Sequence, residues 1–233
     1  LFDDEVIVPS SIGHASVDKV KASSILTKTS GFMDTYDFSL NPYSGCTFGC
    51  VYCYAASFAR GIEKRNDWGN WVSVKENALG LLRKQREKLR DKVVYMSSVT
   101  DPYQPVEQKT KITRALIKEL LLFHANLVIQ TRSPLVTRDI DLLVEFKKRV
   151  QVNMTVTTDS ETIRKEFEPT CPSNSARLRA ISEIHEAGIP SCITMTPLLP
   201  VENAEEFSKT LLATGVERFI IQPFHPEKGR FVA

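Results

Sequence analysis

The 233-residue chain is 42% hydrophobic and 25% charged, a composition that excludes an intrinsically disordered protein. Its formal net charge of +2 excludes a surface covered with basic residues, so any contact with nucleic acid must be local. The sequence contains no run of about 18 apolar residues and opens with an acidic segment, so we expect a cytoplasmic protein without a membrane-spanning helix or a signal peptide.

The first 40 residues show little periodic patterning. Turn residues cluster at 10–13 and 28–31, with only short apolar groups between them. We expect residues 1–37 to form an irregular N-terminal arm that lies on the main body. A disordered tail is the alternative that composition leaves open.

From residue 38 onward, strand patterns alternate with helical patterns. Short runs rich in apolar and β-branched residues predict six buried strands, at about 38–44, 93–96, 127–131, 150–156, 191–195 and 218–221. Apolar residues at helical spacing predict five helices, at 76–91, 110–124, 138–149, 175–187 and 202–214. This alternation predicts one parallel α/β core domain over residues 38–233, with its chemistry at the carboxyl ends of the strands.

Three of the five cysteines follow the first predicted strand closely. In the motif Cys46-x3-Cys50-x2-Cys53, three thiolates can hold three irons of a [4Fe–4S] cube and leave the fourth iron open to another ligand. Gly45 and Gly49 would let the backbone wrap closely around a cluster. The neighbouring aromatic residues would shield it from water.

Zinc binding and simple packing are the alternatives for these cysteines. A structural zinc site needs four ligands, and the sequence has no second C-x2-C pair and no histidine at a helpful spacing. Packing alone does not explain three cysteines in one aromatic, glycine-rich loop. An odd number of cysteines without an export signal also favours metal ligation over disulfides. The iron–sulfur cluster is therefore the favoured interpretation.

The cysteine motif, with an aromatic residue before its third cysteine, resembles that of the radical S-adenosylmethionine (SAM) superfamily. Six segments, in the expected order, are similar to the spore photoproduct lyase-like branch: NPYSGCTFGCVYCYA, SSVTDPYQPVE, TRSPLVTRDIDLL, FEPTCPSNSARLRAI, EAGIP and TPLLP. The resemblance covers about residues 20–222. It implies a partial (β/α)6 barrel that uses a [4Fe–4S] cluster and SAM.

In that superfamily the open iron chelates SAM. One electron from the cluster cleaves SAM to methionine and a 5′-deoxyadenosyl radical, which abstracts a hydrogen atom from the substrate. The resemblance implies that Cys46, Cys50 and Cys53 bind iron. It implies SAM contacts from eight residues: Tyr52, Ser98, Thr100, Asp101, Arg132, Thr155, Arg177 and Thr196.

Each of these SAM contacts has a plain structural alternative. Oxygens of Thr100 and Asp101 can accept hydrogen bonds from the SAM ammonium, but the segment can equally form a turn or a helix cap. Arg132 and Arg177 can pair with the SAM carboxylate, but either can be a surface charge, Arg177 on a solvated helix face. Thr155 can reflect only the β propensity of threonine.

Two cysteines lie outside the motif, and two are too few for a second cluster. We interpret Cys171 and Cys192 as packed thiols, with a radical partner as the alternative for Cys171. One departure from the branch concerns a thiol that spore photoproduct lyase carries just after its second strand as a hydrogen donor. The matching stretch here, 97–99, reads Ser-Ser-Val, so the resemblance does not extend to thymine-dimer repair.

Three functions remain open. The first is a lyase-type radical SAM enzyme that acts on a large substrate, either nucleic acid or peptide. The second is a peptide-modifying splicease or maturase that works with a small partner protein, for which an exposed pair, Trp68 and Trp71, is a candidate docking surface. The third is a non-catalytic iron–sulfur or zinc protein on the same fold. The resemblance also implies an electron donor such as flavodoxin or ferredoxin.

Overall fold

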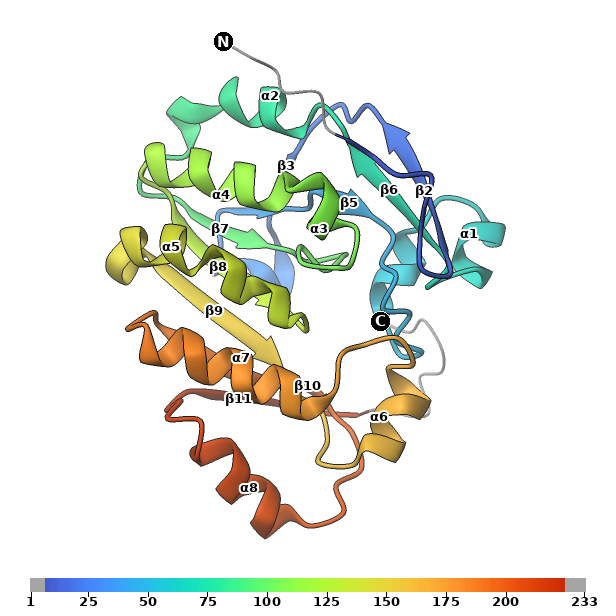
Figure 1. Ribbon diagram of the computed structural model, residues 1–233. Coiled ribbons are helices and arrows are strands. Elements are labelled where there is room, and N and C mark those ends of the chain that lie inside the picture. The colour runs from blue at the N-terminus through green and yellow to red at the C-terminus, as the bar shows by residue number, and fades with distance from the viewer. Residues whose placement is uncertain (1–6, 225–233) are drawn as a thin grey trace.

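A seven-stranded sheet forms the centre of the molecule in the computed structural model, which describes residues 7–224 (Figure 1). Neighbouring strands are parallel, except for the antiparallel pair β3 and β4 at one edge. In spatial order the strands are β11 (Phe219–Pro223), β10 (Ser191–Leu198), β9 (Val150–Thr155), β8 (Asn126–Thr131), β7 (Val93–Met96), β4 (Phe38–Leu40) and β3 (Leu26–Lys28).

The six parallel strands lie side by side in chain order, from β4 to β11. Helices α4, α5, α7 and α8 follow one another along one side of this sheet (Figure 1). Right-handed crossovers between successive neighbouring strands place these four helices on the same side, so the sheet winds as in a barrel and not as in a doubly wound fold. In the described part of the chain the edge strands β3 and β11 do not pair with each other. The predicted α/β fold with a partial barrel is confirmed.

The helices are shorter than the sequence predicts. The predicted helix 76–91 stops at Arg83 and continues as a 3-10 turn. The region 138–149 is mostly 3-10 helix, with Lys147 in a non-helical conformation. The α-helices are α1 (Ile62–Asn66), α2 (Ala78–Arg83), α3 (Glu107–Thr110), α4 (Ile112–Leu122), α5 (Ile140–Leu143), α6 (Glu161–Phe167), α7 (Asn174–Glu186) and α8 (Ala204–Leu212). No helix within residues 7–224 has the length and apolar character needed to cross a membrane.

The N-terminal segment is not irregular, which corrects the prediction for its described residues. It contributes β3 to the main sheet and two strands to a second, four-stranded sheet. That sheet consists of β1 (Ser11–Ile12), β2 (Ala15–Val20), β6 (Trp71–Lys75) and β5 (Tyr43–Ser44). Residues 15–18 do alternate between buried and exposed, but the pattern is too short to stand out in the sequence.

The predicted strand 38–44 is divided between the two sheets. β4 belongs to the main sheet, whereas β5 pairs with β6 in the second sheet. Pro42 lies between them, and its missing N–H prevents a continuous ladder. The loop that carries the three cysteines therefore begins where the chain leaves one sheet and joins the other.

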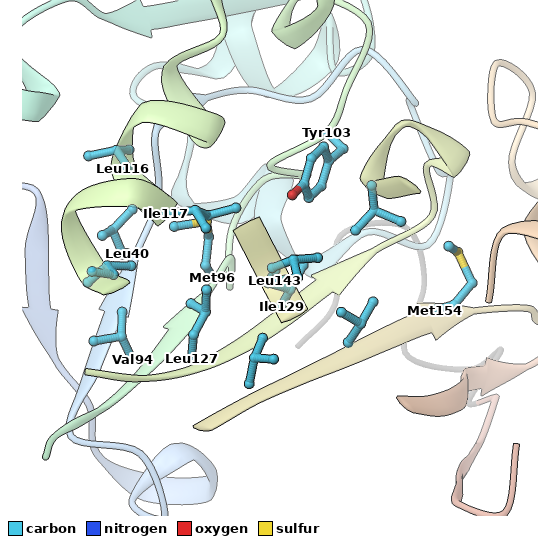
Figure 2. Close-up of a cluster of buried hydrophobic side chains, with 14 of the residues drawn as sticks. Leu40, Val94, Met96, Tyr103, Leu116, Ile117, Leu127, Ile129, Leu143 and Met154 are labelled. Atoms are coloured by element: carbon cyan, nitrogen blue, oxygen red, sulfur yellow. The ribbon is translucent and has the colours of Figure 1, made fainter. Parts of the chain in front are cut away.

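The apolar core lies between the parallel strands and the helices (Figure 2). Val94 and Met96 of β7 and Leu127 and Ile129 of β8 are buried there with Leu116 of α4. Burial of each such side chain contributes about 1.5–3 kcal/mol. This layer fixes the strands against the helices, and so fixes the polar side chains at the strand ends.

Candidate active site

The three motif cysteines lie together in the loop after β5. Cys46 and Cys50 are buried, and Cys53 is half-buried. They form a small apolar cluster with Phe48 and Tyr52, two of the aromatic residues expected to surround them. The loop stands at the carboxyl end of β4 and β7, where the parallel strands carry their polar residues.

Glycines allow the cysteine loop to pack against the turn before β6. Gly49 has φ +58°, and Gly69 has φ +106°. A Cβ on Gly69 would lie 2.9 Å from the Cα of Gly49, and a Cβ on Gly45 would lie 2.6 Å from the Trp71 ring. These close approaches explain why the positions need glycine: a side chain there would collide across the contact between the cysteine loop and the segment that packs against it.

The tryptophan pair is not an exposed docking surface, which corrects that expectation. Trp71 is only 6% exposed, and its ring meets that of Trp68 edge to face, with centroids 6.0 Å apart. Trp68 packs against the cysteine cluster. Both rings therefore support the cysteine loop from behind.

Thr100 and Gln104 hold the backbone of the cysteine loop from the end of β7. The Thr100 hydroxyl donates to the Gly45 carbonyl at 2.6 Å, and the Gln104 amide nitrogen donates to the Thr100 hydroxyl at 3.0 Å. The Thr47 N–H donates to Gln104 Oε1 at 3.0 Å. Gln104 is fully buried, and no motif in the sequence marks this amide as a functional residue.

Asp101 joins the end of β7 to the end of β8. Its Oδ1 accepts hydrogen bonds from the Tyr103 N–H at 2.8 Å and the Thr131 hydroxyl at 2.7 Å, and its Oδ2 accepts from the Arg132 N–H at 2.7 Å. Burial raises the pKa of Asp101, and these hydrogen bonds oppose the rise. Both carboxylate oxygens are thus hydrogen-bonded within the protein, as the turn interpretation predicts.

Ser98 belongs to a polar group centred on Asn41. The N–H groups of Ser98 and Val99 donate to Asn41 Oδ1 at 2.9 and 3.0 Å, and the hydroxyls of Ser98 and Ser39 are 2.6 Å apart. The Tyr54 hydroxyl donates to the Ser98 carbonyl. This group links β4, β7 and the segment after Cys53.

A buried carboxylate, Glu168, lies between the two arginines expected at the site. Arg177 Nη2 is 2.6 Å from Glu168 Oε2, and Arg132 Nε is 3.4 Å from Glu168 Oε1. Glu168 and Arg177 have 0% exposed side chains, so Arg177 does not lie on a solvated helix face. Burial favours a higher pKa for Glu168, but the two guanidinium groups hold it below its ordinary value.

Tyr52 connects the cysteine loop to this charged group. Its hydroxyl donates to Glu168 and accepts a hydrogen bond from Arg132 Nη2 at 2.9 Å. The Arg132 guanidinium also lies 5.7 Å from the centroid of the Tyr52 ring. The Arg132 side chain is 20% exposed. A partly accessible cation therefore stands beside the three cysteines. Arg132 was predicted as a site residue from the sequence, but its partner Glu168 was not.

Thr155 lies in a polar strip on the face of the sheet opposite the apolar core. Its hydroxyl accepts from Gln130 Nε2 at 2.7 Å and lies 3.0 Å from the Thr194 hydroxyl. The Tyr95 hydroxyl donates to Gln130 Oε1 at 3.1 Å. The strip crosses β7, β8, β9 and β10, and half-buried Thr196 lies near the end of β10.

The donor set fits an iron–sulfur cube better than a single metal ion. Within residues 7–224, no group of three or more histidine, cysteine, aspartate or glutamate side chains is placed to hold one metal ion. A cube makes no such demand, because each thiolate binds a different iron. All five cysteines are free, so the three motif thiols are available for this role.

Comparison with known proteins places the chain in a family. The model of the Radical SAM superfamily matches residues 40–213. An uncharacterised protein of Methanocaldococcus jannaschii is 36% identical over 163 residues, which cover 70% of this chain and 61% of that protein. An uncharacterised protein of Acidianus two-tailed virus is 30% identical over 208 residues, which cover 82% and 68% respectively. The chain thus spans 61% and 68% of these two relatives.

Solved structures agree on the fold. A spore photoproduct lyase variant with bound AdoMet and dinucleoside spore photoproduct has a TM-score of 0.66 at 17% identity, over 91% of this chain and 63% of that one. Streptococcus suis SuiB bound to S-adenosylmethionine has a TM-score of 0.52 at 12% identity, over 83% and 42% respectively. With a family model that covers most of its length, the chain belongs to the radical SAM superfamily, whose members use a [4Fe–4S] cluster and SAM.

Proposed function

We propose that this chain forms the catalytic core of a radical SAM enzyme that abstracts a hydrogen atom from a large substrate. The observation that supports this most is the position of one loop with three cysteines beside the Arg132 guanidinium, at the carboxyl ends of parallel strands. Cys46, Cys50 and Cys53 would hold the cluster. When both are bound, the cluster and SAM would supply, with one electron from a donor, a 5′-deoxyadenosyl radical for hydrogen abstraction.

In this proposal Arg132 binds the carboxylate of SAM. Two guanidinium groups, of Arg132 and Arg177, face the single carboxylate of Glu168, so the group keeps a net positive charge. Arg177 is completely buried, whereas Arg132 is partly exposed and can meet a ligand. A guanidinium can bind a carboxylate through two parallel hydrogen bonds.

The other expected SAM residues divide into two roles in this proposal. Thr100, Asp101 and Arg177 make their main contacts within the protein, so they position the cysteine loop, the end of β8 and Glu168. Four residues remain proposed neighbours of SAM from their places on the cysteine loop and at the strand ends, although the hydroxyls of the first three also bond within the protein: Tyr52, Ser98, Thr155 and Thr196.

For the substrate we propose a nucleic acid. The similar lyase structure contains a dinucleoside, and the polar strip carries the uncharged, half-buried side chains of Tyr95 and Gln130, whose hydroxyl and amide groups suit base edges. The electron donor would be a flavodoxin or ferredoxin in the cytoplasm. β7 runs into Ser97 and Ser98, so a hydrogen-donor thiol at this position is not part of the proposal.

The test is anaerobic reconstitution with iron and sulfide, followed by incubation with SAM and dithionite. The proposal predicts methionine and 5′-deoxyadenosine from the wild-type protein and neither from Cys46→Ala, Cys50→Ala or Cys53→Ala. A cluster that never cleaves SAM would contradict it and favour a non-catalytic iron–sulfur protein.

The same assay distinguishes the substrate classes. Deuterated oligonucleotides should transfer deuterium into 5′-deoxyadenosine, whereas deuterated peptides should not. Transfer from a peptide, with none from oligonucleotides, would replace the nucleic-acid proposal with the peptide-modifying alternative. A short precursor peptide encoded beside the gene would point the same way.

A further inference from the structure

The sequence analysis placed Cys171 outside the cysteine motif, but in the structure Cys171 lies against the motif cysteines. Its Sγ lies 3.7 Å from the Sγ of Cys50, although 121 residues separate the two in the chain. Cys171 is only 6% exposed and belongs to the same buried cluster as Cys46 and Phe48. A fourth thiol therefore touches one of the three proposed iron ligands.

The position of this thiol is fixed by the loop between α6 and α7. The Thr170 hydroxyl donates to the Thr47 carbonyl, in the cysteine loop itself, at 2.6 Å. Arg164 Nη1 donates to the Cys171 carbonyl at 2.8 Å, and the Cys171 N–H donates to the Glu168 carbonyl at 3.1 Å. Bonds on both sides of the residue hold Cys171 against the cysteine loop.

The contact between the two sulfurs becomes directional once iron binds. An iron-bound Cys50 is a thiolate without a proton, so only Cys171 can donate in the pair. The Phe48 carbonyl, 3.9 Å from the Cys171 Sγ, is the competing acceptor. An anionic sulfur accepts a hydrogen bond more strongly than a neutral carbonyl, and it is also nearer.

We propose that Cys171 donates an S–H hydrogen bond to the Cys50 sulfur and thereby raises the reduction potential of the cluster, without itself binding iron. This inference rests on the proposed cluster site. Hydrogen bonds to cluster sulfurs are among the factors that set the potential of an iron–sulfur centre. A donor stabilises the reduced cluster more than the oxidised one, because the reduced cluster carries one more negative charge.

The experiment is an anaerobic redox titration followed by electron paramagnetic resonance, on wild type, Cys171→Ala and Cys171→Ser. Cys192→Ala is the matched control, since Cys192 is also a buried thiol but lies on β10 outside the cysteine cluster. We expect a more negative midpoint potential in Cys171→Ala and an unchanged one in Cys192→Ala. Cys171→Ser, whose hydroxyl can still donate, should lie between Cys171→Ala and wild type.

Iron content separates the possible outcomes. All four proteins should retain about four irons per chain. Full iron with an unchanged midpoint in Cys171→Ala would overturn the proposed hydrogen bond, and loss of iron from Cys171→Ala and Cys171→Ser would make Cys171 a ligand instead. If Cys171→Ala does not fold, the midpoint potential of the nearly isosteric Cys171→Ser tests the hydrogen bond instead. A value more negative than that of wild type supports the bond, and an unchanged value overturns it. A wild-type protein that binds no cluster would refute the proposed function instead.

Discussion

Glu168 is the residue whose charge the rest of the site depends on. It is completely buried and accepts contacts from Tyr52, Arg132, Arg177 and the Thr157 hydroxyl, the last at 3.0 Å. A buried carboxylate is tolerated only when paired, and removal of one partner leaves the others uncompensated. Loss of the Glu168 charge would leave two guanidinium ions, of Arg132 and Arg177, without a counter-charge.

We therefore expect Glu168→Gln to lower the free energy of unfolding by about 3–5 kcal/mol, measured by urea denaturation at neutral pH. The folded-state pKa of Glu168 lies below its unfolded value of about 4.3. The wild-type advantage should thus be complete above pH 4.3 and disappear as the pH falls through the folded value. An advantage that grows with acidification would contradict the ion-pair assignment.

Arg132 provides the prediction for SAM binding. Loss of a charge-assisted hydrogen bond costs about 1.5–3 kcal/mol, so Arg132→Ala should weaken SAM binding about tenfold to a hundredfold. Arg132→Lys should recover part of the affinity, because the charge returns but the bidentate geometry does not. The measurement is a SAM titration of the reconstituted variants, followed by the cluster signal, which should be unchanged without SAM. Unchanged affinity in Arg132→Ala would remove this side chain from the SAM site.

Single residues were predictable where their chemistry is carried by a local motif. Cys46, Cys50 and Cys53 needed only their spacing. Glu168 and Gln104 were missed, because an acid or an amide has no local signal for burial. Their roles arise from contacts between segments far apart in the chain.

Among the elements, the cysteine loop depends most on backbone shape. Gly49 and Gly69 approach each other so closely that either Cβ would press on the opposite backbone. Both also have positive φ values, which side chains disfavour. The loop can therefore keep its place only with glycine on both sides of the contact.

Gly69→Ala should consequently lower the melting temperature and the iron retained after reconstitution. Gly80→Ala is the matched control, because Gly80 lies in α2 and a Cβ there meets nothing within 4 Å. Helix propensity predicts that this control gains about 0.5–1 kcal/mol. Equal melting temperatures and iron contents in the two variants would show that the loop contact is unimportant.

Element types were easier to predict than element limits. Amphipathic spacing located α4, α7 and α8, but not the division of the chain around α5 into 3-10 turns. Helix α6 was not predicted, although Ser160 caps its start by accepting from the Ile163 N–H at 3.3 Å. Only seven residues follow that cap, too few for a clear helical period.

For the whole molecule, strand–helix alternation was enough to predict six parallel strands. Their sequential order places the polar ends of β7, β8, β9 and β10 along one edge, around the cysteine loop. The second sheet was not predictable, because β2 and β6 pair across 50 residues of intervening chain. The same is true of the contact between Thr170 and Thr47, which closes the site.

Mössbauer spectroscopy of the protein reconstituted with ⁵⁷Fe, with and without SAM, examines the proposed three-cysteine cluster site itself. Three cysteine ligands predict a cube in which three irons keep their signal and one distinct iron changes when SAM is added. If the spectra of all four irons stay the same when SAM is added, or if a single metal ion is bound in place of a cube, the proposed site is wrong.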